Sequence, residues 1–233
     1  MGIVSVQKLN LGCGPGRHAP GWIHVDGSWN ARLAGMPRLR RLLGALGIIP
    51  HEIAVSEWTP GIVTADLRRP LPFASASADC IYGSHVLEHL YDDEARRLLG
   101  ECHRVLRPGG VIRLVVPDLF SLAQRYVAAV SGPRPTPNGR APADQLNDDL
   151  HLRPRSVRGG HLLFRLYTAA TEFHTHKWMY DAESLVERIR AAGFMEVEPR
   201  QYLDSRIPAI GEVEQAGRVL DGAGVCVEGV NAA

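Results

Sequence analysis

A glycine-rich turn directly after an apolar run near the N-terminus most constrains what this chain can fold into. The run covers residues 3–11, and residues 12–16 read Gly-Cys-Gly-Pro-Gly. Such a turn can bring bare backbone N–H groups against a ligand, because glycine adopts conformations that other residues avoid. A second apolar run, residues 22–25, ends at Asp26, which is placed to accept hydrogen bonds from a ribose diol. The pattern predicts two strands that bind a ribose-containing ligand at their ends.

The spacing of this turn departs from the dinucleotide-binding fingerprint. Gly12, Gly14 and Gly16 are spaced Gly-x-Gly-x-Gly, whereas the fingerprint is Gly-x-Gly-x-x-Gly with an acid about 20 residues further on. Asp26 comes sooner, and the Pro-Gly pair at residues 20–21 leaves little room for a full helix between the strands. We therefore do not expect the turn to bind a pyrophosphate.

Four later segments continue the pattern. They are Ala-Asp-Leu with the nearby Pro-Leu-Pro-Phe at residues 65–73, the run 78–90, the turn 104–111 and the helix–strand junction 191–197. With the glycine turn they resemble, in the same order, the motifs of the class I S-adenosylmethionine-dependent methyltransferases, over residues 3–200. The resemblance implies an α/β, Rossmann-like fold with a mostly parallel seven-stranded sheet and helices on both faces. It also implies one domain over residues 1–233 and S-adenosylmethionine as the cofactor.

Apolar periodicity locates several elements of this fold. It predicts one amphipathic helix over residues 86–106, whose main part starts near Asp92. Residues 111–116 are typical of a buried strand. Asp181 is a good N-cap for the helix that follows it, and the valines of the tail 225–230 suit a final edge strand.

Two stretches do not fit the alternation of strands and helices and predict insertions, at about 29–61 and 118–180. The first is basic and amphipathic, and we interpret it as a surface helix with its apolar face on the core, a lid over the acceptor, or a patch that rests on anionic lipid. The second starts as a helix and becomes rich in proline and arginine. We expect its residues 131–160 to be mobile and to become ordered over the acceptor site.

Composition limits the partners and the compartment. The formal net charge of +1 over 233 residues gives no electrostatic footprint for nucleic acid. The four cysteines include no Cys-x-x-Cys pair, which suits a reducing cytosol. No apolar run approaches the roughly 20 residues needed to span a bilayer. We expect a cytoplasmic protein without a nucleic-acid partner; peripheral membrane contact and the oligomeric state stay open.

Ligands in open α/β sheets lie at the carboxyl ends of the strands, so the residues that follow the predicted strands should converge on one crevice. Asp26 would bind the ribose diol, and Asp66 with Leu67 the adenine side. The alternative for Asp26 is a turn-forming role before Gly27, and for Asp66 it is a cap of the following turn. The cofactor-binding residues expected from the resemblance are Leu11, Gly12, Cys13, Gly14, Asp26, Asp66, Leu67, Ser84 and His85.

Histidines beside the expected methyl group decide the catalytic interpretation. His85, Glu88 and His89 share one face if their segment is helical. With the later His-x-His-Lys at 174–177, the pattern is similar to that of small-RNA 2′-O-methyltransferases. That resemblance implies Glu88, His89 and His176 as ligands of a divalent metal, although His85 stands where the fourth ligand would be glutamate. The alternatives are His85 or His176 as a metal-free base, and purely structural histidines.

The chemistry of methyl transfer narrows the function. The acceptor must be held close to the methyl carbon, and a hydroxyl acceptor must also lose its proton. We therefore expect O-methylation of a small molecule or of a glycan or glycolipid intermediate. N-methylation is the alternative chemistry. A cofactor-binding partner protein that has lost catalysis and a Rossmann oxidoreductase are the alternatives of other classes.

Overall fold

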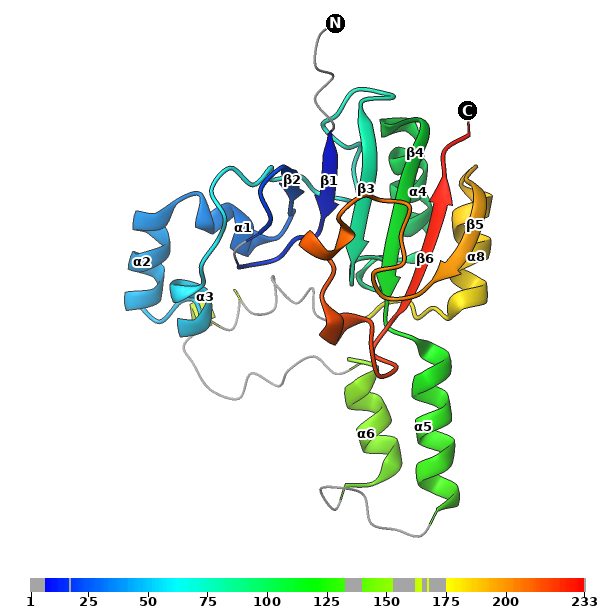
Figure 1. Ribbon diagram of the computed structural model, residues 1–233. Helices are drawn as coiled ribbons and strands as arrows, with labels where there is room; N and C mark the ends of the chain where they lie inside the picture. The colour runs from blue at the N-terminus through cyan, green and yellow to red at the C-terminus, as the bar shows by residue number, and fades with distance from the viewer. Residues whose placement is uncertain are drawn as a thin grey trace, which may run out of the picture.

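A six-stranded sheet forms the centre of the protein, as the computed structural model in Figure 1 shows. The structure describes residues 7–16, 18–132, 140–152, 162–164, 167 and 175–232. The strand order is β2-β1-β3-β4-β6-β5, and β6 runs antiparallel to both of its neighbours, whereas the other three pairings of these strands are parallel. The sheet is therefore mostly parallel, as expected. The strands are β1 (Lys8–Leu11), β2 (Trp22–Val25), β3 (Ala78–Ser84), β4 (Leu106–Val116), β5 (Met195–Arg200) and β6 (Val225–Val230).

The two faces of the sheet are covered differently. On one face, leucines and isoleucines of α4 and α8 pack in a common core with β1, β3 and β4. On the other face, the segment 201–224 packs over Tyr82 and Val115 through Ile207 and Ile210. The helices are α1 (Trp29–Ala34), α2 (Pro37–Ala45), α3 (His51–Val55), η1 (Leu87–His89), α4 (Asp92–Val105), α5 (Leu119–Ser131), α6 (Pro142–Asp149), α8 (Ala182–Ala191), η2 (Ile210–Glu212) and η3 (Ala216–Arg218).

The described part of the chain has six strands where seven were expected. At the position of the missing strand, Val63 makes one isolated parallel bridge to Val25. Its amide donates to the carbonyl of His24 at 2.9 Å, and its carbonyl accepts from the Asp26 amide at 3.1 Å. A Pro-Gly pair before Val63 and the turn at Asp66 after it leave too few residues for a full strand. The bridge nevertheless places this segment beside the end of β2.

The sequence suggested that residues 225–230 form an edge strand, but β6 lies inside the sheet. It pairs with β4 on one side and with β5 on the other, so β5 is the edge. Glu228 of β6 and Glu214 both bond Arg113 of β4, and all three side chains are fully buried. The helix expected over residues 86–106 is also two elements. Leu90 adopts an extended conformation that ends η1, and α4 then begins with three acidic residues in its first turn.

The first insertion folds into α1, α2 and α3 beside β2, the strand at one edge of the sheet (Figure 1). The expected packing of its apolar face on the core is wrong for α2, which has no buried residue. The second insertion begins as α5, which packs against α6. The stretch 131–160 that was expected to be mobile lies partly outside the described residues. Within the described ranges, no helix combines the length and apolarity that crossing a bilayer requires.

Candidate cofactor and acceptor site

The glycine turn has the backbone conformation that its sequence predicted. Gly12 and Gly14 have φ values of +63° and +67°, in the left-handed region that favours glycine. A Cβ atom on Gly12 would overlap Val86 of the loop after β3, whereas nothing lies within 4 Å of a Cβ on Gly14. The turn therefore touches the β3 loop on one side and is open on the other.

The expectation of bare N–H groups on this turn is wrong. The amides of Gly12 and Cys13 both donate to the carbonyl of Val25, at 2.8 and 3.2 Å. The amide of Gly14 donates to Asp26 Oδ2 at 2.9 Å. Burial raises the pKa of the Cys13 thiol to about 12, so this side chain stays neutral. The turn is preorganised by the end of β2, and it offers a ligand the open space beside Gly14.

Asp26 is buried at the end of β2 and ties two loops together. Its Oδ2 accepts from Gly14, and its Oδ1 accepts from the Ser28 amide at 2.8 Å. Each carboxylate oxygen has a further lone pair that a hydroxyl donor can use. The turn-forming role is therefore present, and these two hydrogen bonds fix the orientation of the carboxylate.

Asp66 lies on the neighbouring loop, but its carboxylate makes hydrogen bonds within that same loop. Its oxygens accept from the amide of Arg68 and from the Arg68 guanidinium, both groups lying at 2.9–3.0 Å. Hydrogen bonds from Arg68 lower the pKa of this carboxyl. A Cβ on Gly27 would overlap the carbonyl of Ala65, so the loops that carry Asp26 and Asp66 are in contact. The next residue, Leu67, is partly buried against the main core.

Ser84 and His85 end β3 on the other side of the glycine turn. Ser84 is buried, and its carbonyl accepts from Arg218 at 3.2 Å. His85 has a φ of +56°, which is a strained conformation for a residue with a side chain. Its Nδ1 lies 3.1 Å from Glu88 Oε1, and its Nε2 lies 3.3 Å from the carbonyl of Arg218. Both ring nitrogens are thus engaged with oxygen atoms of the protein.

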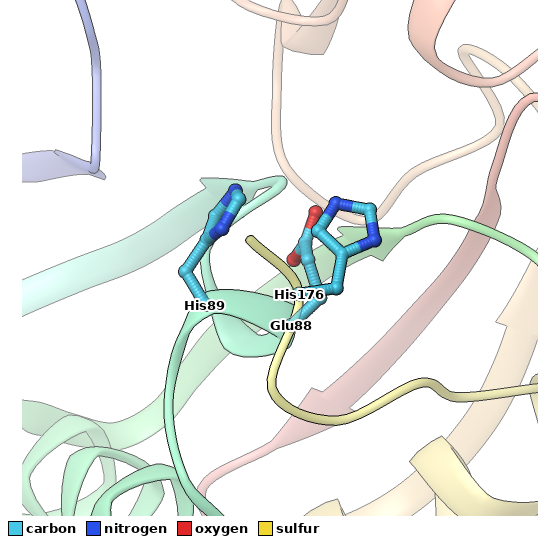
Figure 2. Close-up of side chains that lie close together, drawn as sticks. All are labelled: Glu88, His89 and His176. Atoms are coloured by element: carbon cyan, nitrogen blue, oxygen red, sulfur yellow. The ribbon is translucent and has the colours of Figure 1, made fainter. Parts of the chain in front are cut away.

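Glu88, His89 and His176 come together beyond the end of β3, as Figure 2 shows. One ligand atom from each lies within 4.8 Å of the other two. Glu88 and His89 come from η1, and the 175–178 segment supplies His176. The backbone fixes this approach, because the carbonyl of Glu88 accepts from the amides of Lys177 and Trp178, at 2.7 and 3.3 Å. The convergence does not require the long helix that the sequence suggested.

The electrostatics of this cluster are unusual. Glu88 is fully buried, and apart from its contact with His85 no donor in the described residues reaches either carboxylate oxygen. Burial lowers the pKa of His176 to about 4, so its ring is neutral near pH 7. Its Nδ1 is buried without a hydrogen-bond partner in the described part of the chain. The Nδ1 atom of His89 faces the carbonyl of Thr175 at 3.4 Å.

Comparisons with known proteins bear on the family of the chain. Residues 9–114 match the family model described as a methyltransferase domain. This match supports a class I S-adenosylmethionine-dependent methyltransferase. A protein of Mycolicibacterium smegmatis named a probable S-adenosylmethionine-dependent methyltransferase is 44% identical over 82 residues, which are 34% of this chain and 31% of that protein.

Two other matches extend the comparison. An uncharacterized protein encoded in a transposon of Streptomyces fradiae is 30% identical over 120 residues, or 52% of this chain and 32% of that protein. This methyltransferase therefore spans about a third of the length of these two relatives. A solved structure from Thermotoga maritima, titled as a possible histamine N-methyltransferase, has a TM-score of 0.49 at 18% identity and covers 97% of this chain and 81% of that one.

The structure adds residues to the site of this methyltransferase that the sequence did not indicate. Residues 211–215 and Arg218 line a cavity of about 150 Å³ together with Gly12, Cys13 and Ser84. They lie about 200 positions after the glycine turn in sequence, and no local motif marks them. His151 is a second addition, because its ring lies 4.8 Å from that of His176. Its carbonyl also accepts from the His176 amide at 3.3 Å.

Proposed function

We propose that this chain transfers a methyl group from S-adenosylmethionine to a hydroxyl of a small molecule or of a glycan or glycolipid intermediate. The convergence of Glu88, His89 and His176 beyond β3 carries the proposal. An amine acceptor has a lone pair ready for attack once it is neutral, whereas a hydroxyl must be activated. A carboxylate and two imidazoles beside the cofactor turn supply the groups for that activation.

The residues at the strand ends fit the cofactor. Gly14 leaves open space in which a Cβ would intrude, and Asp26 holds a carboxylate at the end of β2. We assign Asp26 to the ribose diol of the cofactor, and Asp66 and Leu67 to its adenine side. The remaining contacts with the cofactor are assigned to residues 11–14, Ser84 and His85. When bound, the cofactor would supply a methyl carbon that an in-line nucleophile can attack while the neutral thioether leaves.

The acceptor side of the site is suited to a divalent cation. A buried carboxylate, whose one near donor among the described residues is His85, and two imidazoles form the donor set of a transition-metal site. Glu88, His89 and His176 would hold the ion, which lowers the pKa of a bound hydroxyl. The carbonyl of Thr175 would orient His89 from behind.

His176 and His85 have different roles in this proposal. With a pKa of about 4, His176 is a weak base and a good ligand, because a ligand has to be neutral. His85 has both nitrogens engaged, and its contact with Glu88 makes it a positioning residue for that carboxylate. A metal-free base mechanism would rely on His176, whose low pKa makes it a weak base, or on His85, which would have to release its present contacts.

A labelled-methyl experiment tests the proposal. Cofactor with a ¹³C-methyl group is incubated with the protein and with fractions of small metabolites and of lipid-linked glycans, and the product is read by NMR. We expect an O-methyl signal that a chelator abolishes and a divalent ion restores, and that His176→Gln removes. The matched control is His51→Gln, which changes an exposed histidine of α3. An N-methyl product, or transfer that survives both the chelator and His176→Gln, would refute the assignment of the acceptor site.

A further inference from the structure

The outer side of the first insertion carries a stripe of exposed apolar side chains. Met36, at the N-cap of α2, and Leu39 and Leu42 within α2 recur at helical spacing and are between 40% and 55% exposed. Trp29 of α1 is also exposed. Such a group on one short segment exceeds the scattered apolar side chains of an ordinary surface.

The opposite side of the same helix explains why the stripe faces outward. A Cβ on Gly44 would lie 2.6 Å from Cβ of Ala54, so α2 packs on α3 through this position. Arg40 lies on this inner side too, where it donates to the carbonyl of Ser56 at 2.8 Å. With 3.6 residues per turn, the side chains at 39, 42 and 46 cannot face α3 at the same time.

The charged side chains beside this apolar stripe are positive. Arg38 and Arg41 lie on α2 beside the apolar stripe and are exposed. Arg32 of α1 is exposed as well, and its guanidinium lies 5.5 Å from the Trp29 ring. No Asp or Glu occurs from residue 27 to residue 51. The insertion therefore presents leucines flanked by arginines and free of local acids.

We propose that α1 and α2 form a docking surface for an anionic lipid bilayer. Leucine and tryptophan side chains insert at the boundary of headgroups and acyl chains, and arginines pair with lipid phosphates. A second copy of the chain fits less well, because the same arginines would then face one another. Nucleic acid offers phosphates but no apolar phase for Leu39 and Leu42. The inference stands on the insertion alone and goes beyond the proposed methyl transfer.

The position of this surface relates it to the cofactor turn. A hollow of about 560 Å³ lies between the insertion and the turn, lined by Arg40, Trp58 and His18 among others. His18 Nε2 lies 3.0 Å from the carbonyl of Gly14. In Figure 1, α2 is at the outer edge of the molecule, and α1 lies between it and β2. A docked bilayer would thus lie on the cofactor-turn side of the sheet, where a lipid-linked acceptor could reach the site.

Co-sedimentation with vesicles tests the docking surface. The full chain is mixed with vesicles of equimolar phosphatidylglycerol and phosphatidylcholine, and with vesicles of phosphatidylcholine alone. We expect binding to the first and not the second, falling at least tenfold in the double variant Leu39→Ser, Leu42→Ser. Arg38→Gln with Arg41→Gln should weaken it by roughly fivefold per arginine, and added salt should weaken it further.

The matched control is Val127→Ser with Val130→Ser, which changes two equally exposed valines of α5 and should leave vesicle binding unchanged. An unchanged melting temperature and an unchanged response to S-adenosylhomocysteine show that each variant is folded. The inference is overturned if the wild-type chain ignores anionic vesicles, if the leucine variant binds as well as wild type, or if the leucine change instead converts a dimer to a monomer in size-exclusion chromatography. Failure of methyl transfer with intact vesicle binding would refute only the proposed function.

Discussion

Alanine at Gly12 should cost far more stability than alanine at Gly14, although both glycines have nearly the same backbone conformation. The φ values of +63° and +67° give each substitution the same left-handed penalty, about 1–2 kcal/mol. Only at Gly12 would the new Cβ overlap Val86, and such overpacking costs a further 1–3 kcal/mol or so. Gly12→Ala should therefore lower the free energy of unfolding by about 2–5 kcal/mol, and Gly14→Ala by about 1–2 kcal/mol.

Urea unfolding of a double-mutant cycle measures this difference. Val86→Ala removes the methyl groups that the new Cβ would meet, so the double variant Gly12→Ala, Val86→Ala should recover roughly 1–3 kcal/mol relative to additivity. Gly14→Ala with Val86→Ala should be additive, because nothing lies within 4 Å of a Cβ at Gly14. Equal losses for the two glycine variants, or no coupling between Gly12 and Val86, would contradict the contact between the cofactor turn and the β3 loop.

Three further predictions follow from the site and its surroundings. Asp26→Ala should weaken the binding of S-adenosylhomocysteine by about 1.5–3 kcal/mol in calorimetry, whereas unchanged affinity would rule out the ribose role. Burial lowers the pKa of His176 from 6.5 to about 4, so the unfolded chain takes up its proton first. The free energy of unfolding of metal-free protein should then fall as the pH drops from 6.5 to 4, more in wild type than in His176→Gln, and equal slopes would contradict this burial. Arg113→Met should destabilise the fold by about 3–5 kcal/mol in denaturant unfolding, because it removes the guanidinium that Glu214 and Glu228 share in the core; a change under about 1 kcal/mol would contradict a structural role for this buried ion network.

Sequence patterns predicted the features that depend on local backbone. The glycine turn, the strand that ends at Asp26 and the Asp181 cap are each set by a few neighbouring residues, and all three are present. The direction of the turn amides was wrong for a non-local reason. They are occupied by the carbonyl of Val25 and the carboxylate of Asp26, which belong to the next strand.

Other features depend on contacts that no local pattern reports. The amphipathic period of α2 reveals that its apolar side chains share one side of the helix. It does not reveal whether that side faces the core or the solvent. Arg113 stands inside a buried apolar strand, and its partners lie about 100 residues further along the chain. The approach of His176 to Glu88 is made by backbone hydrogen bonds, so only the resemblance to metal-binding methyltransferases, and no spacing rule, pointed to that pair.

Metal analysis after equilibrium dialysis tests the central claim most directly. The protein is dialysed against Mn²⁺ or Zn²⁺ in the presence of S-adenosylhomocysteine, and bound metal is compared between wild type, Glu88→Gln, His89→Gln and His176→Gln, with His51→Gln as the control. The account predicts one ion per chain in wild type and the control, and none above background in the three site variants. Wild-type protein without bound metal, or site variants that bind as much metal as wild type, would contradict the assignment of Glu88, His89 and His176 as the acceptor-activating centre.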